Sequence, residues 1–229
     1  MEAARDTIRD AATIVLVRDR TREPRILVGR RGSTAVFMPD KFVFPGGAVD
    51  AADGRVRLRA TPTPLCMTRL TLQSAMPEVG PLLACAVREL WEETGIRLAE
   101  APDPAGRRQD LPEEWVEFCA DGMMPSARSL VFFYRAITPP GRTRRYDARF
   151  FYGDVDEIPL AGDPDQLDDT SGELLDLQWV RLSDTGELDF PFITRLVISR
   201  LLDVLPCPGP PPDIPFRFQQ DGIRKLTTL

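Results

Sequence analysis

The sequence predicts an α+β sandwich built as a single domain, and three observations lead to this prediction. The chain has 229 residues, of which 43% are hydrophobic and 28% charged, values close to those of compact globular domains. Short β-branched runs come first, followed by a helical segment, further strand-like runs and a last helical segment. This order lacks the regular alternation of strand and helix that is typical of a parallel doubly wound sheet.

Two strands and a glycine-containing loop are expected near the start of the chain. Residues 12–17 and 25–28 are β-branched runs separated by a polar segment, which predicts a hairpin. Residues 41–44 form a third extended segment that runs into Pro45-Gly46-Gly47. Proline restricts φ there, and the two glycines allow the backbone to approach another group closely.

The strongest helical pattern covers residues 81–94. Proline suits the first helical position, apolar side chains recur at helical spacing, and Gly95 can end the helix. Residues 54–80, which lie between the glycine loop and this helix, are polar and interrupted by prolines. We interpret them as an insertion.

The second half of the chain predicts further strands and a closing helix. Residues 130–137 and 149–152 read as strands separated by a Pro-Pro-Gly turn, and residues 177–182 as another strand. An amphipathic helix is expected over residues 190–205. From about residue 206 the chain is rich in proline, which we interpret as a C-terminal tail of the same domain.

Charge and residue content exclude several classes of function. With 29 basic and 35 acidic residues the net charge is −6, which argues against broad contact with a nucleic-acid polymer. Apolar runs fall short of the roughly 18 residues of a membrane span, and the first residues are too charged for a secretory signal, so a cytoplasmic protein is expected. The absence of histidine excludes Ser-His-Asp and Cys-His catalysis. The chemistry must therefore depend on carboxylates and arginines, with or without a metal ion.

Three carboxylates on the predicted helix form the strongest candidate site. Glu89, Glu92 and Glu93 are spaced at i, i+3 and i+4, which places them on one helical face within a turn. Three like charges so close repel one another, and a hard divalent cation such as Mg²⁺ or Mn²⁺ would reverse that repulsion. The alternative is an acidic helix face exposed to solvent.

The residues around these carboxylates resemble the signature of the Nudix hydrolase family, G-x5-E-x7-R-E-U-x-E-E-x-G-U, in which U is aliphatic. Residues 88–96, which read Arg-Glu-Leu-Trp-Glu-Glu-Thr-Gly-Ile, fit every specified position of its second half, and Gly47 matches the first glycine. Asp53 stands where the family has Glu. Between Asp53 and Arg88 lie 34 residues in place of 7, an insertion of 27. An insertion at this point resembles the branch that includes peroxisomal coenzyme A diphosphatases.

This resemblance implies a Nudix-type α/β/α sandwich with a mixed central sheet. It implies metal-dependent hydrolysis of a diphosphate linkage in a nucleoside diphosphate joined to another group, and coenzyme A or a derivative is one such substrate. Glu89, Glu92 and Glu93 would hold Mg²⁺ or Mn²⁺, with Glu89 as ligand or general base. The catalytic set then consists of Glu89, Glu92 and Arg88, whose guanidinium could orient a carboxylate.

Further candidates come from two charged segments. Residues 154–176 hold nine carboxylates without Lys or Arg, and from these we choose Glu173 as an additional metal ligand. The densest basic cluster follows the Pro-Pro-Gly turn and could meet the phosphates of the substrate, including a 3′-phosphate in coenzyme A. The candidate substrate-binding residues are Gly46, Gly47, Arg142, Arg144 and Arg145. The alternatives are a solvated loop carboxylate and a solvated hairpin edge.

Two other functions remain open at this point. Asp53 and the long insertion are also consistent with a Nudix-fold module that binds or senses a nucleotide without hydrolysing it. A structural protein with a coincidental acidic helix is the third alternative. The expected partner is a small nucleotide-diphosphate substrate, with no nucleic-acid polymer and no membrane, and a homodimer is left open.

Overall fold

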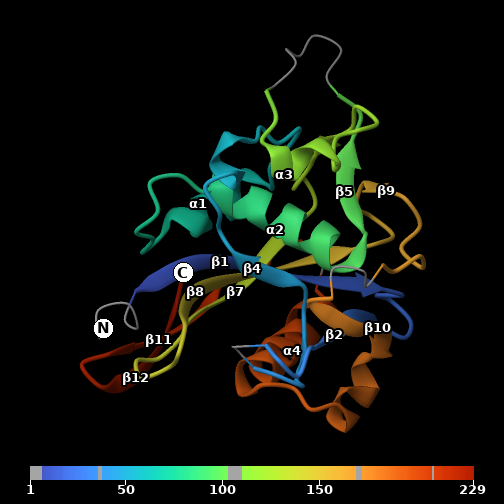
Figure 1. Cartoon of the computed structure of the whole chain (residues 1–229). Coiled ribbons are helices and arrows are strands. Elements are labelled where there is room, and N and C mark those ends of the chain that lie inside the picture. Colours follow the sequence, from blue (N-terminus) through green and yellow to red (C-terminus); the bar gives the residue numbers. More distant parts are fainter. Residues whose placement is uncertain (1–6, 36–37, 103–109, 169–171, 208) are drawn as a thin grey trace.

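The computed structural model describes residues 7–35, 38–102, 110–168, 172–207 and 209–229. A mixed β-sheet lies between two helical layers, with α2 (Gly80–Thr94) over one face and α4 (Phe192–Val204) over the other (Figure 1). This arrangement confirms the predicted sandwich. Among the helices described, none combines the length and apolar character needed to cross a membrane.

Nine strands of the described chain form the main sheet, in the order β10-β2-β1-β8-β7-β11-β12, with β3 beside β2 and β4 beside β1. These strands are β1 (Ile8–Arg18), β2 (Arg25–Arg31), β3 (Phe42–Val43), β4 (Gly46–Ala48), β7 (Val131–Ile137), β8 (Arg145–Asp154), β10 (Leu174–Arg181), β11 (Pro215–Gln220) and β12 (Ile223–Thr228). A smaller sheet has the order β6-β5-β9 and contains β5 (Arg97–Glu100), β6 (Met124–Pro125) and β9 (Leu160–Ala161). The shorter helices are α1 (Pro64–Thr71), α3 (Glu113–Val116) and two 3₁₀ helices, Asp53–Arg55 and Leu182–Glu187.

The main sheet is mixed because β1 pairs in parallel with β8, and β7 pairs in parallel with β11. Alternation along β1 separates the two hydrophobic layers, as expected for side chains that point to opposite faces of a strand. Ile14 and Leu16 pack in the layer of α2, whereas Val15 and Val17 pack in the layer of α4. The centre of the sheet is therefore covered on both faces.

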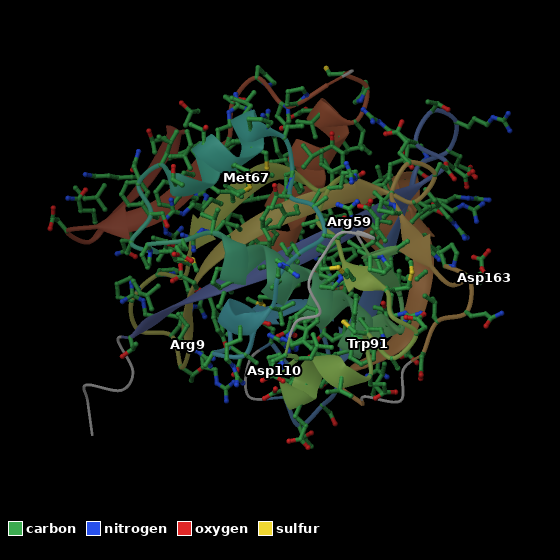
Figure 2. All side chains as sticks on the ribbon, turned by 90° about the horizontal axis from the view of Figure 1, so that it is seen from above. Arg9, Arg59, Met67, Trp91, Asp110 and Asp163 are labelled. Atoms are coloured by element: carbon green, nitrogen blue, oxygen red, sulfur yellow. The ribbon has the colours of Figure 1, made fainter. Side chains whose placement is uncertain are left out.

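Helix α2 begins and ends as its sequence predicts. Pro81 lies in its first turn, and Gly95 takes a φ of 76° and donates its N–H to the carbonyl of Trp91 at 2.8 Å. The side chain of Trp91 lies at the α3 side of the helix (Figure 2), where its ring meets Phe118 edge-on with 5.5 Å between ring centroids. This packing holds α2 in one orientation over the sheet.

The glycine segment is a strand and not the loop that the sequence predicts. Strands β1 and β2 pair with each other at Val17 and Arg18, and β3 and β4 then pair with β2 and β1 respectively. A side chain at Gly46, whose φ is 155°, would collide with the carbonyl oxygen of Ala12. Glycine is required because β1 and β4 lie so close together.

The insertion is anchored to the sheet by the buried side chain of Arg135. It contains α1, whose Cys66 and Leu70 are buried in the layer of α2. Arg135 of β7 donates to the carbonyl oxygens of Leu72 and Gln73, each at 3.0 Å. The polar composition of the insertion therefore does not make it a loose surface loop.

The end of the chain adds to the sheet, which the interpretation as a tail did not predict. Strands β11 and β12 form an antiparallel hairpin, and β11 pairs with β7 at Phe216 and Arg217. Figure 1 shows this hairpin at the edge of the sheet beside β7. The phenyl ring of Phe216 is buried beneath the guanidinium of Arg135, which lies 4.2 Å from the ring centroid.

Candidate active site

The three glutamates of α2 differ in burial. Glu93 is 3% exposed, the side chain of Glu89 is 13% exposed, and that of Glu92 is 37% exposed. All three lie at the end of α2 that approaches β4. The helix therefore presents a graded set of carboxylates, from the protein interior to the surface.

Arg88 connects this set to Asp53. Its Nε and Nη2 donate to the two carboxylate oxygens of Asp53 at 2.8 and 3.0 Å, and both side chains are buried. Its Nη1 donates to Glu89 at 2.9 Å and to Glu92 at 2.7 Å. Asp53 thus holds the planar guanidinium in a two-pronged contact, and Arg88 in turn orients two of the helix carboxylates.

The two glycines of β4 lie against the carboxylates of Glu93 and Glu89. The N–H of Gly46 donates to Glu93 at 2.8 Å. A side chain at Gly47 would occupy the position of the Glu89 carboxyl group. Both glycines therefore allow close approach between β4 and α2, and their backbone borders the carboxylate group.

Burial perturbs the protonation of all three glutamates. Desolvation raises the pKa of Glu89 to about 7, against the opposing effect of Arg88 and with a further increase from Glu92. Desolvation and then the charge of Glu89 raise the pKa of Glu93 well above its usual value, and desolvation also raises the pKa of Glu92. The folded protein thus disfavours three negative charges at this place.

Glu173 lies close enough to the three glutamates of α2 to affect their pKa values. It immediately precedes β10, and its charge contributes to the raised pKa of Glu89, Glu92 and Glu93. The structure therefore brings this member of the acidic stretch to the helix carboxylates. Asp169, another of the nine carboxylates, lies outside the described residues.

The donor set fits a hard divalent cation in its chemistry. Carboxylate oxygens are the ligands that Mg²⁺ and Mn²⁺ prefer, and a bound cation would offset the desolvation and the like-charge repulsion that raise these pKa values. In the described part of the chain, no three acidic or cysteine side chains already converge on one point. Arg88 instead holds Glu89 and Glu92, and Gly46 holds Glu93.

A cavity of about 540 Å³ opens beside β4 on the α4 side of the sheet, and Gly46 and Gly47 form part of its wall. Of the basic cluster predicted to bind phosphate, Arg142 lines this cavity. Arg144 is exposed and does not line it. Arg145 is buried and donates its Nε to the carbonyl of Thr138 at 3.1 Å, so this guanidinium is turned toward its own hairpin.

The sequence did not predict three other arginines of the cavity wall, which are Arg31, Arg217 and Arg224. Arg31 ends β2, and its charge lowers the pKa of Glu93 against the larger effect of burial. Arg217 and Arg224 belong to the C-terminal hairpin. Their role depends on strands that meet only in the folded chain, so local sequence gave no signal for it.

Comparisons with known proteins agree on one group of relatives, although no family model matches the chain. The chain is 28% identical over 180 residues to putative nudix hydrolase 7 of Caenorhabditis elegans, covering 75% of this chain and 51% of the relative. It is 30% identical over 177 residues to acyl-coenzyme A diphosphatase NUDT19 of Gallus gallus, covering 55% and 47%. The chain spans about half the length of the curated relatives that it matches.

Among solved structures, the chain is similar to a NUDIX hydrolase from Alicyclobacillus acidocaldarius. The TM-score is 0.63 at 26% sequence identity, and the match covers 87% of this chain and 93% of that chain. The similarity therefore extends over most of the fold.

Proposed function

The chain belongs to the Nudix hydrolase family, and we propose that it hydrolyses the diphosphate linkage of a nucleoside diphosphate joined to another group. The observation that carries this proposal is the arrangement of Glu89, Glu92 and Glu93 around Arg88 beside β4. Hydrolysis of a diphosphate builds up negative charge on phosphate oxygens. This site combines oxygen ligands for a cation with a cavity that β4 borders.

Glu89, Glu92 and Glu93 would hold Mg²⁺ or Mn²⁺, with Glu173 as a further ligand. The metal would neutralise phosphate oxygens and lower the pKa of the attacking water. Arg88 and Asp53 keep the carboxylates oriented. Gly46 and Gly47 let β4 lie close to these carboxylates and also border the cavity, so a diphosphate bound along β4 would reach the carboxylates. Glu89, whose pKa is raised by burial to about 7, is suited to accept a proton near neutral pH if it does not act as a ligand.

Coenzyme A or an acyl derivative is the substrate that we propose. Support comes from the insertion within the signature and from a relative that is named an acyl-coenzyme A diphosphatase. Adenosine, diphosphate and a long pantetheine arm are joined in this molecule, and the cavity of about 540 Å³ that Gly46 and Gly47 border offers space for part of it.

The test is product analysis of the purified protein with Mg²⁺ and with Mn²⁺. Coenzyme A, acyl-coenzyme A, ADP-ribose, NADH, a diadenosine polyphosphate and nucleoside triphosphates would be compared by mass spectrometry. We expect coenzyme A or its acyl derivative to be cleaved at the diphosphate. Binding of one compound without any product would instead indicate the regulatory module.

Two substitutions connect turnover to the site. We expect Glu92→Gln and Glu93→Gln to lower kcat by about 100-fold or more, because each removes a negative oxygen ligand while keeping the side-chain shape. Glu114→Gln, at an exposed glutamate of α3, is the matched control and should retain the rate of the natural protein. Near-normal rates in both site variants would contradict the metal assignment.

A further inference from the structure

The cavity beside β4 is assembled from segments that are distant in sequence. Its walls come from β1, β4, the hairpin of β7 and β8, the start of α4 and the C-terminal hairpin of β11 and β12. Its volume of about 540 Å³ lies within the range of roughly 300–1,000 Å³ typical of small-molecule sites. The C-terminal hairpin therefore helps to shape a ligand site as well as extending the sheet.

The charge of this wall is opposite to that of the whole chain. Although the net charge is −6, the lining that the structure describes includes four arginines and not one carboxylate. The side-chain Nε atoms of Arg31 and Arg217 are buried and have no hydrogen-bond partner among the described residues. Both arginines thus keep a donor available for an acceptor within the cavity.

The arginines occupy two separate parts of the cavity. Arg31 pairs across the sheet with Leu174, next to Glu173, and its charge acts on Glu93, so it lies at the diphosphate end. Arg217 and Arg224 lie on the C-terminal hairpin, and Arg142 on the turn between β7 and β8. In the described chain these three guanidinium groups form no ion pair with a carboxylate, so their charge is not already neutralised.

Aromatic side chains line the same cavity as these arginines, and they are Phe44, Tyr146, Phe150, Phe192 and Phe218. The guanidinium of Arg217 lies 5.7 Å from the ring centroid of Phe192 at the start of α4. A planar base can stack on such rings, while the arginines of the same wall can bind a phosphate.

We infer that this cavity binds the nucleoside half of the substrate and that Arg217, with Arg142 and Arg224, binds a second phosphate carried on its ribose. This inference rests on the proposed function, since it places the scissile diphosphate at Gly46 and Gly47. An acyl chain fits this part of the cavity poorly, because it would remove guanidinium groups from water without supplying acceptors. The substrate class is a nucleoside diphosphate derivative with a ribose phosphate.

Direct binding tests the inference without turnover. Calorimetry on the whole chain, in the absence of metal, compares adenosine 3′,5′-bisphosphate with AMP, which lacks the ribose phosphate. We expect the natural protein to bind the bisphosphate at least about 10-fold more tightly, the effect of one charge-assisted contact. Arg217→Gln should reduce this ratio toward one, and Arg142→Gln, from a different element, should also reduce it.

Lys225→Gln provides the matched control, because it removes a positive charge from the same hairpin at a position outside the cavity wall. This variant should keep the ratio of the natural protein. If Arg217→Gln fails to fold, as judged by circular dichroism, Arg217→Lys and Arg142→Gln serve the same purpose, because lysine keeps the charge but loses the planar fork. Equal binding of the two nucleotides, or an unchanged ratio in the folded arginine variants, would overturn the inference.

Kinetics separate this inference from the proposed function. With metal present, kcat/KM would be compared for coenzyme A and 3′-dephospho-coenzyme A, and the arginine variants should lose preference for the former while still cleaving the latter. Failure to cleave either compound would contradict the proposed substrate and not the phosphate site, which the calorimetry tests alone. Cleavage of both at equal rates by the natural protein would count against the phosphate site.

Discussion

Glu89 has a protonation equilibrium that folding changes. Because burial raises its pKa from 4.5 to about 7, the folded protein keeps a proton on this carboxyl group over a pH range in which the unfolded chain has lost it. The contribution of this group to stability is therefore greatest below pH 4.5 and is lost as the pH rises toward 7. Glu93, whose pKa is raised in the same direction, adds to this trend.

We expect the metal-free protein to lose unfolding free energy between pH values near 4.5 and near 7, and Glu89→Gln to lose less of it. Urea unfolding in a chelator, followed by circular dichroism at both pH values, measures this difference. Glu114→Gln is the control for removal of one carboxylate. The same pH dependence in the Glu89 variant and the natural protein would show that Glu89 titrates normally.

Asp53 stabilises Arg88 within the fold. We expect Asp53→Ala to lower the unfolding free energy by about 3 kcal/mol, because it leaves a buried guanidinium without its two-pronged partner. Asp121→Ala, which removes an exposed partner of Arg97, should have a much smaller effect. Equilibrium denaturation of the three proteins gives the comparison, and equal stabilities would show that Glu89 and Glu92 suffice to hold Arg88.

The sequence predicts the carboxylates of the site better than its cations. Glu89, Glu92 and Glu93 belong to one helical turn, so their spacing alone places them together. Asp53 could be aligned with the signature, but its burial and its contact with Arg88 depend on where the insertion leaves and rejoins the domain. Arg31 and Arg217 reach the wall of one cavity only through long-range strand pairing, which local spacing does not encode.

At the level of elements, Arg135 connects the insertion to the sheet. Its side chain is 2% exposed, and the guanidinium contacts Asp147 at 2.8 and 2.6 Å as well as the two carbonyl groups that follow α1. We expect Arg135→Met to lower the unfolding free energy by about 3 kcal/mol. It removes the donor of both hydrogen bonds to Asp147, which keeps only a longer contact with Arg149 at 3.4 Å, and it leaves the two carbonyl groups without their side-chain donor.

The same substitution should also loosen the segment between α1 and α2. Hydrogen exchange followed by mass spectrometry would show faster exchange there than in α4. Arg181→Met, at an exposed arginine of β10, is the control and should change neither stability nor exchange by a comparable amount. Unchanged protection of the insertion in Arg135→Met would mean that α1 packing alone holds it.

The C-terminal hairpin could have been predicted from its turn residues, but the proline-rich segment before it led us to interpret the region as a tail. Asp221 and Gly222 both have positive φ, 51° and 77°, which is the conformation of a tight two-residue hairpin turn. An Asp-Gly pair between two strand-like runs is typical of such turns. The pairing of β11 with β7 could not be predicted in this way, because it depends on the edge that β7 leaves open.

At the scale of the whole molecule, the order of elements predicts the sandwich but not its strand order. Alternating side chains and amphipathic helices determine which surfaces must be buried, and so favour a sheet between two helical layers. Parallel pairing of β1 with β8 joins segments that are far apart in the sequence, and no local pattern in either strand indicates the other as its partner. The mixed character of the sheet was accordingly expected from the family resemblance and not from periodicity.

The ladder between β1 and β8 has a consequence for biosynthesis. Every residue pair in it, from Ile8 with Arg145 to Val17 with Asp154, is separated by 137 residues along the chain. At about 5–20 residues per second, the ribosome needs roughly 7–27 seconds to make this stretch. During that interval the central strand has no partner on this side, so early synthesis exposes an apolar strand edge that a chaperone would have to shield.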